Sequence, residues 1–252
     1  MQQGTPLSPV LLTILRRARR MVVLTGSGVS AESGVPTFRD AQTGMWSTFN
    51  PDELATRQGF RRNPRLVWEW YASRRKMMAE TAPNPGHLAL AQMERRIPEF
   101  VLVTQNIDGL HQRAGSRQVV ELHGNINRAK CFLEDTIFNS WREDQDIPPR
   151  CPHCGAHLRP DVVWFGEALP LAALRTAIDA AQNCDVFLSI GTSGEVEPAA
   201  SLPFEALSRG ATVVEVNPHE TPLSTRATFR LNGPSGRLLP LLVNEVWGDL
   251  SI

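Results

Sequence analysis

The stretch at residues 21–39 reads MVVLTGSGVSAESGVPTFR. Its first four residues are apolar and indicate a buried strand. The residues Gly26, Gly28 and Ala31 that come next fit the glycine-rich turn from a strand into a helix, whose free N–H groups accept a pyrophosphate. The same short pattern also fits a glycine turn that only closes a corner between strand and helix. The stretch favours a nucleotide-binding α/β fold.

The segment after this turn differs from that of an ordinary dehydrogenase. Such an enzyme carries an acidic residue about 20 positions further on, which holds the ribose, and none is found here in that context. Instead, Pro36 breaks any helix near Ser33 and Gly34, and an irregular segment runs through Trp46 to Pro51. The sequence therefore predicts a nucleotide bound beside an irregular loop rather than in a hydride-transfer pocket.

Length and composition limit the possible classes. The chain has 252 residues, 42% of them hydrophobic, so it can bury one large domain, with or without a small insertion. Basic and acidic residues balance at 26 each, and we expect no direct binding of nucleic acid. No apolar run approaches the roughly 18 residues of a membrane span and no signal-peptide pattern is visible, so we expect a cytoplasmic protein without a membrane partner. Four unevenly spaced cysteines suit metal ligation better than disulfides.

Apolar runs alternate with helical patterns along the chain, as in a parallel sheet covered on both faces. The expected strands are 21–24, 100–103, 119–122, 185–190 and 211–216, and the expected helices are 7–19, 64–80, 86–96, 171–182, 198–208 and 240–247.

Two stretches interrupt this alternation. We therefore expect an α/β fold in which residues 1–40, 82–126 and 160–252 form a Rossmann-like domain, a parallel sheet with helices on both faces. Residues 41–81 and 127–159 would form a smaller inserted lobe, made of helices and a cysteine-containing module.

Nearly every expected strand ends in a polar or glycine signature. Any one of them fits an ordinary capping role, but five together predict one crevice, because ligands bind outside the carboxyl ends of strands in open α/β sheets. The five signatures are Thr25 to Gly28, Thr104 to Asp108, Glu121 to Gly124, Gly191 to Ser193, and Glu215 to Pro218.

Six motifs in order give the chain a resemblance to a known family. They are GSGVS at 26–30 with GVPTFR at 34–39, TQNIDGLH at 104–111, LHG at 122–124, CPHC at 151–154, RPDVVWFGE at 159–167 and GTS at 191–193. The chain resembles the sirtuins, the NAD-dependent protein lysine deacylases, from about Arg20 to Leu242. The resemblance implies the Rossmann-like domain and a zinc-ribbon-like module in the smaller lobe.

The resemblance also implies a reaction in which NAD is consumed. The acyl-lysine carbonyl oxygen displaces nicotinamide, and His123 then acts as the general base on the ribose hydroxyl that attacks the resulting imidate. Histidine suits this role, because its ordinary pKa of about 6.5 leaves a neutral base at cellular pH. The products are lysine, nicotinamide and O-acyl-ADP-ribose, and the partners are acylated lysine side chains of proteins.

The resemblance to the sirtuins implies the roles of further site residues. Asn106 positions a water molecule near the reacting ribose, Asp108 with neighbouring backbone holds the nicotinamide carboxamide, and both count with His123 as catalytic residues. The residues expected to bind NAD are Gly26, Ser27, Gly28, Ser30, Phe38, Arg39, Gln105, Asn106, Ile107, Asp108, Gly191, Thr192, Ser193 and Asn217.

The segment 162–167 has β-propensity, and the resemblance implies that an extended substrate peptide pairs with it. We expect Val163, Phe165, Gly166 and Glu167 to contact the peptide. An ordinary core strand fits Val162 and Val163 equally well, because both side chains can face inward.

A second substrate prediction concerns Tyr71 and Arg74, which are three residues apart and share one face of an expected helix. In a sirtuin branch that removes succinyl and malonyl groups, a Tyr-x-x-Arg pair at the matching place receives the acyl carboxylate. A guanidinium with a phenol hydroxyl suits a planar carboxylate. The alternative is an aromatic and basic helix face half buried in the smaller lobe.

The metal module departs from the family pattern of two Cys-x-x-Cys pairs. The pair of Cys151 and Cys154 is intact, but the first pair reads Cys131 and Glu134. A carboxylate can ligate zinc, so three cysteines with Glu134 can still form a tetrahedral structural site. Other outcomes are no metal, or a fourth ligand from Asp135, His153 or His157.

The leading hypothesis is thus NAD-dependent protein lysine deacylation, of acetyl and of succinyl and malonyl groups. One alternative keeps NAD but transfers ADP-ribose to a protein or to water. Another, a binding module without catalysis, is disfavoured by the intact His123, Asn106 and Asp108.

Overall fold

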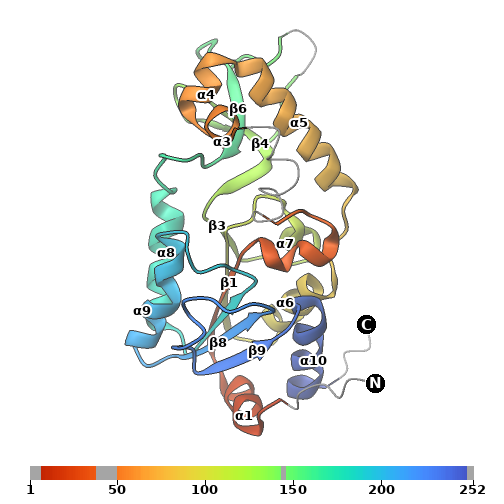
Figure 1. The fold of residues 1–252 in the computed structure, drawn as a ribbon, viewed down its shortest axis with the longest axis vertical. Helices are drawn as coiled ribbons and strands as arrows, with labels where there is room; N and C mark the ends of the chain where they lie inside the picture. The colour runs from red at the N-terminus through yellow and green to blue at the C-terminus, as the bar shows by residue number, and fades with distance from the viewer. Residues whose placement is uncertain (1–6, 38–49, 143–145, 249–252) are drawn as a thin grey trace.

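The computed structural model describes residues 7–37, 50–142 and 146–248. The larger of its two sheets has six parallel strands in the order β3-β2-β1-β7-β8-β9 (Figure 1). Because the order reverses between β1 and β7, the switch point at which such sheets bind ligands lies there. The strands are β1 (Arg20–Thr25), β2 (Glu99–Thr104), β3 (Val119–Glu121), β7 (Val186–Ile190), β8 (Thr212–Asn217) and β9 (Phe229–Asn232).

Helices cover both faces of this sheet, which confirms the predicted α/β class. On one face lie α1 (Pro9–Arg17), α6 (Pro85–Glu94) and α10 (Ser235–Trp247), and on the other α8 (Leu171–Asn183) and α9 (Leu202–Ser208). Strand β1 shows why residues 21–24 are continuously apolar. Val23 packs into the core on the α10 side and Val22 into the core on the α8 side, so residues 21–24 face the two hydrophobic layers in turn.

A smaller lobe stands at the carboxyl edge of the sheet (Figure 1). Over the described residues it contains the antiparallel sheet β5-β4-β6 and the helices α3, α4 and α5. The elements are β4 (Gly124–Cys131), β5 (Ile137–Phe138), β6 (Leu158–Val162), α3 (Pro51–Leu54), α4 (Arg57–Arg62) and α5 (Pro64–Glu80). Helix α5 begins where Pro64 and the capping side chain of Asn63 predict. The lobe boundaries expected from the sequence fall inside β4 and β6, and the division into domains stays a prediction.

Three details correct the sequence-based expectations. Helix α10 begins at Ser235 rather than Pro240, which lies inside it. A proline there costs about 3 kcal/mol. Each of the buried Leu238, Leu239, Leu242 and Val243 contributes about 1.5–3 kcal/mol, and together they outweigh that cost. Strand β9 is not predicted by the sequence pattern, because three of its four residues are only partly buried, among them Arg230, and the fourth, Asn232, is exposed.

The third correction concerns the peptide-pairing segment, because β6 ends at Val162 and residues 163–167 continue as an irregular stretch. Over the described residues, no helix combines the length and apolarity of a membrane span.

Candidate active site

The carboxyl ends of the strands are tied to one another by backbone hydrogen bonds. The Gln105 amide donates to Thr25 O at 3.0 Å, and the Gly191 amide donates to Val216 O at 3.0 Å. The side chain of Asn217 adds a bond from Nδ2 to Thr192 O at 2.8 Å. These bonds bring the predicted strand ends to one edge of the sheet, and together they form a preorganised polar rim.

The glycine turn is built differently from the expectation. In place of the expected α-helix, residues 27–33 form two 3₁₀ turns, η1 (Ser27–Val29) and η2 (Ala31–Ser33). The amides of Gly26 and Gly28 already donate to Ile190 O and Gly191 O, at 3.1 and 2.9 Å. A Cβ on Gly28 would lie 2.7 Å from Gly191 O, so glycine is required because the two loops touch.

Donors for phosphate remain elsewhere in the same loops. Within the described residues, the backbone amides of Ser27 and Ser193 make no hydrogen bond. Two serine amides on adjacent strand ends are a suitable anion cradle. Phe38 and Arg39, also expected to bind NAD, lie outside the described residues.

A buried polar network lies beneath the turn. Asn106 Nδ2 donates to Gly26 O and to Ser30 Oγ, both at 3.1 Å. Because both amide hydrogens are used, only the carbonyl oxygen of Asn106 remains to accept from a water molecule or a hydroxyl. Ser30 in turn donates to Asp108 Oδ2 at 2.8 Å, and Asp108 Oδ1 accepts from the Leu110 amide at 2.8 Å. The network fixes the orientation of Asn106 and Asp108, and burial raises the pKa of Asp108.

The residues that support this network are not among the predicted catalytic or NAD-binding residues. Thr25 Oγ1 bonds to Thr104 Oγ1 at 2.8 Å and to His111 Nε2 at 2.9 Å. The ring of His111 lies 4.8 Å from that of His87, whose Nε2 faces Ser30 at 3.4 Å. Burial lowers the pKa of His87 to about 4 and that of His111 to about 3. The sequence does contain a signal for the pair Thr25 and Thr104, since two neighbouring strands both end in threonine.

The expected base, His123, lies between β3 and β4 and is only partly buried. Its Nδ1 bonds to the Gln105 carbonyl oxygen at 2.9 Å. A carbonyl can only accept, so Nδ1 carries the proton and Nε2 keeps its lone pair. Burial lowers the pKa of His123, which favours the neutral base. The site therefore holds this imidazole in the tautomer that general-base catalysis requires.

Tyr71 and Arg74 lie one turn apart on α5. Tyr71 is buried in an apolar cluster with Ile126 and Trp164, and its hydroxyl accepts from Trp164 Nε1 at 3.0 Å. Burial raises its pKa to about 12 and lowers the pKa of Arg74. The guanidinium of Arg74 lies 3.9 Å from the centre of the Trp70 ring. Tyr71 is thus buried inside the lobe, whereas Arg74 is only partly buried and lies beside Trp70.

The segment 162–167, which is expected to pair with a substrate peptide, is anchored by two backbone hydrogen bonds. The Val163 amide donates to His123 O and the Phe165 amide to Ala55 O, both at 2.9 Å. Phe165 is 56% exposed and, with Gly166 and Glu167, borders a surface pocket that also involves α4. The segment is therefore accessible to a partner and anchored beside His123.

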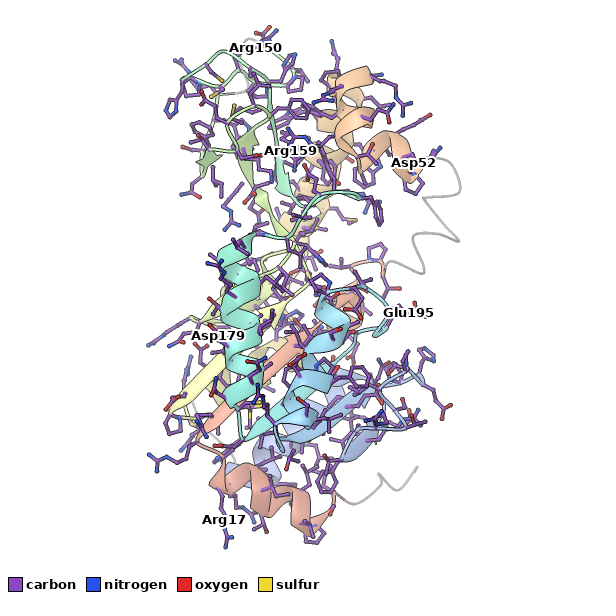
Figure 2. All side chains as sticks on the ribbon, turned by 90° about the vertical axis from the view of Figure 1, so that its left-hand side faces the viewer. Arg17, Asp52, Arg150, Arg159, Asp179 and Glu195 are labelled. Carbon is purple, nitrogen blue, oxygen red and sulfur yellow. The ribbon has the colours of Figure 1, made fainter. Side chains whose placement is uncertain are left out.

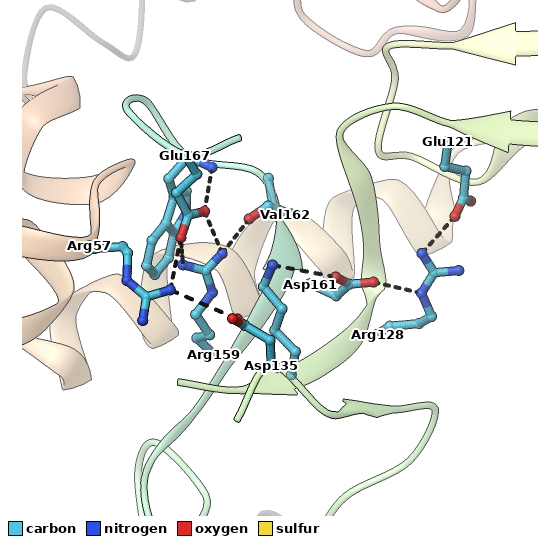
Figure 3. Close-up of polar contacts among 10 residues, drawn as sticks. Arg57, Glu121, Arg128, Asp135, Arg159, Asp161, Val162 and Glu167 are labelled. Atoms are coloured by element: carbon cyan, nitrogen blue, oxygen red, sulfur yellow. Dashed lines mark hydrogen bonds and ion pairs between the residues drawn. The ribbon is translucent and has the colours of Figure 1, made fainter. Parts of the chain in front are cut away.

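The carboxylate of Glu167 is engaged within the chain. It accepts from the fully buried Arg159, which lies in the smaller lobe (Figure 2), at 2.8 and 2.7 Å, and from Arg57 at 3.1 Å (Figure 3). A second charged group joins the two sheets, since Arg128 pairs with Glu121 at 2.6 Å and with Asp161 at 2.9 Å (Figure 3). We therefore expect Glu167 to contact a peptide through its backbone rather than through its carboxylate.

Four potential metal ligands gather at the end of the smaller lobe. The ligand atoms of Cys131, Glu134, Cys151 and Cys154 all lie within 4.8 Å of one another. The Glu134 amide also donates to Cys131 Sγ at 3.4 Å. Three thiolates and a carboxylate fit a tetrahedral structural zinc site. Asp135 instead pairs with Arg57 at 3.8 Å, so the fold brings Glu134 into the group.

Comparisons with known proteins agree with this architecture. Residues 26–198 match the Sir2 family. The NAD-dependent protein deacylase of Aquifex aeolicus (strain VF5) is 53% identical over 81% of this chain and 85% of its own length. The crystal structure of a Sir2 homologue–NAD complex superposes with a TM-score of 0.88 at 42% identity, covering 98% of this chain and 96% of the other. A structure of Sir2 with a p53 peptide and NAD⁺ gives 0.82 at 34% identity, over 94% and 97% of the two chains. The resemblance inferred from six motifs is confirmed, and the chain belongs to the Sir2 family.

Proposed function

We propose that the chain is an NAD-dependent protein lysine deacylase that removes acetyl groups and, through Tyr71 and Arg74, succinyl and malonyl groups. The observation that carries the proposal is the tautomer of His123, whose Nδ1–H···O bond to Gln105 leaves a neutral Nε2 as a base. Relatives named NAD-dependent protein deacylases and a relative solved with NAD support the same activity.

NAD binds as a substrate along the strand-end crevice. It supplies an anomeric carbon that carries nicotinamide as a leaving group. The amides of Ser27 and Ser193 hold its phosphates, since these donors have no other hydrogen bond among the described residues. Thr192 and Asn217 form the adenosine side of the crevice, where Asn217 Nδ2 fixes the loop through Thr192 O.

Asn106 and Asp108 orient the reacting end. The Asn106 carbonyl oxygen accepts from a water molecule or a ribose hydroxyl, because its amide hydrogens are held by Gly26 O and Ser30 Oγ. Asp108 is locked by Ser30 and the Leu110 amide, and it contributes a fixed acceptor to the carboxamide pocket. His123 Nε2 takes the proton of the ribose hydroxyl, and general-base catalysis of this kind contributes typically about 10²- to 10⁴-fold.

The acylated lysine enters beside Val163 and Phe165, whose backbone is anchored to His123 and Ala55. An extended peptide gains main-chain hydrogen bonds there with little sequence preference. A succinyl or malonyl carboxylate meets Arg74 and Tyr71, which offer charge-assisted bonds. The zinc site supports this side of the cleft, because Cys131 and Leu158, in β4 and β6, share one small core.

One experiment tests the proposal. The protein is incubated with NAD and with acetyl-, succinyl- and malonyl-lysine peptides of identical sequence, while peptide mass and nicotinamide release are followed. We expect loss of each acyl group with matching nicotinamide release. Nicotinamide release without any acylated peptide would overturn the proposal in favour of ADP-ribosyl transfer.

A further inference from the structure

The single tyrosine of the chain is held by a tryptophan from a distant segment. Trp164 Nε1 lies 3.0 Å from Tyr71 Oη, although the residues are 93 positions apart. Both side chains are buried, at 2% and 4% exposure. Their bond joins the peptide-pairing segment to the helix that carries the proposed acyl-binding pair.

The direction of this hydrogen bond is fixed by chemistry. An indole nitrogen can donate but cannot accept, whereas a phenol hydroxyl can do both. Tyr71 Oη must therefore accept from Trp164, and its own proton has to point elsewhere. The hydroxyl is thus set as a donor, and its pKa of about 12 keeps that proton in place across the physiological range.

Trp164 is itself held in one orientation. The guanidinium of Arg159 lies 3.7 Å from the centre of its ring. Arg159 has no exposed surface and is fixed by two bonds to Glu167 and one to Val162 O at 2.8 Å. Glu167 Oε2 also accepts from the backbone amide of Trp164 at 2.9 Å. Charge, stacking and backbone contacts together restrict the indole to the rotamer that reaches Tyr71.

We propose that Trp164 is a positioning residue for acyl selectivity: by donating to Tyr71 Oη it directs the tyrosine proton toward the carboxylate of a succinyl or malonyl group. This inference rests on the proposed role of Tyr71 and Arg74. It also gives the internal ion pair of Glu167 and Arg159 a role, since that pair holds the indole. Acetyl-lysine offers no carboxylate, so its removal does not depend on this bond.

The kinetic test is a double-mutant cycle of Trp164→Phe and Tyr71→Phe. We expect Trp164→Phe to lower the ratio of kcat/KM for succinyl- over acetyl-peptide about three- to tenfold, the range for one neutral hydrogen bond. In the Tyr71→Phe background the same change should move the ratio less than about twofold. The matched control is Trp68→Phe, because Trp68 is also buried in this lobe but packs on Trp141. The control should leave the ratio unchanged.

A spectroscopic test uses the fact that Tyr71 is the only tyrosine. With ¹³Cζ-labelled tyrosine the protein gives one ring-carbon resonance, which Trp164→Phe should shift and Trp68→Phe should not. The indole ¹⁵N–¹H signal that Trp164→Phe identifies should move in Tyr71→Phe. If Trp164→Phe fails to fold, the indole ¹⁵N–¹H spectra of the parent and of Tyr71→Phe are compared instead. If the bond exists, one indole signal that is shifted in the parent loses this shift in Tyr71→Phe.

The outcomes separate this inference from the proposed function. If Tyr71→Phe lowers the succinyl-to-acetyl ratio but Trp164→Phe leaves it unchanged, the positioning role is overturned while the acyl-binding pair stands. If Tyr71→Phe and Arg74→Met both leave the ratio unchanged, the acyl-binding role fails and the inference fails with it. An unperturbed Tyr71 resonance in Trp164→Phe would overturn the bond itself.

Discussion

The strand-end crevice and the smaller lobe place reactive side chains by different means. In the crevice, Asn106 and Asp108 come directly after a strand, and the backbone bonds between strand ends fix where they lie. In the smaller lobe, Tyr71 and Arg74 are placed by packing against Trp164 and Trp70. In the proposed function, the parallel sheet supplies the residues of the general chemistry, and the packing of the lobe places the residues proposed to set acyl selectivity.

The largest effect should come from the crevice side, at His123. We expect His123→Ala to lower deacylation of every acyl-peptide at least about 100-fold, because the ribose hydroxyl loses its base. Binding of NAD, measured by calorimetry, should change little. A variant that retains more than about a tenth of the parent kcat would contradict the assignment.

The buried histidine pair beneath the crevice predicts a dependence of stability on pH. The folded-state pKa values of His87 and His111, about 4 and about 3, lie below the ordinary value, so the unfolded chain binds these protons first. The contribution of the two neutral histidines to the free energy of unfolding is therefore full above about pH 6.5. It is lost as the pH falls toward 4, by about 3 kcal/mol for His87 alone.

Urea unfolding between pH 7 and 4 measures this loss. His111→Asn should reduce the dependence of the free energy of unfolding on pH, whereas the exposed His219→Gln should leave this dependence unchanged. A free energy of unfolding that stays constant over this range would show that the pair is not buried in neutral form.

On the side of the smaller lobe, Arg74→Met should reduce selectivity without reducing the general chemistry. Loss of a charge-assisted bond worth about 1.5–3 kcal/mol should lower kcat/KM for succinyl-peptide roughly 10- to 150-fold. Deacetylation should change little, and Tyr71→Phe should act in the same direction but less strongly.

The matched control is Arg65→Met, an exposed arginine on the same helix that pairs with Glu69. An equal fall of both activities in Arg74→Met would mean that the residue supports folding of the lobe rather than acyl choice.

The smallest expected effect concerns the metal. Protein purified without chelator should contain about one zinc ion per chain, because the four ligand atoms form one site. Glu134→Cys should slow zinc loss to chelator, since thiolate is the softer ligand. Asp135→Cys is the control and should not slow it. Absence of zinc by elemental analysis would mean that packing alone holds this part of the lobe.

Much of the crevice could be predicted from short patterns. Apolar runs such as residues 21–24 indicate a strand buried on both faces, and polar residues after each strand indicate a shared edge. The glycine turn was predicted less well. Gly26 and Gly28 were expected to offer amides at a helix start, but the loop after β7 lies so close that their amides bond to it instead.

The sequence by itself determined the parallel sheet, the edge that carries the site, the residue suited to act as base, and the three cysteines of the metal group. Only the tertiary structure decided which nitrogen of His123 carries the proton, which way the Tyr71 hydroxyl donates, and that Glu134 rather than Asp135 joins the cysteines. The physical reason is the separation along the chain of the residues that determine each property. Periodicity and strand-end chemistry are properties of neighbouring residues, whereas the direction of a hydrogen bond depends on which distant atom packing brings within about 3 Å.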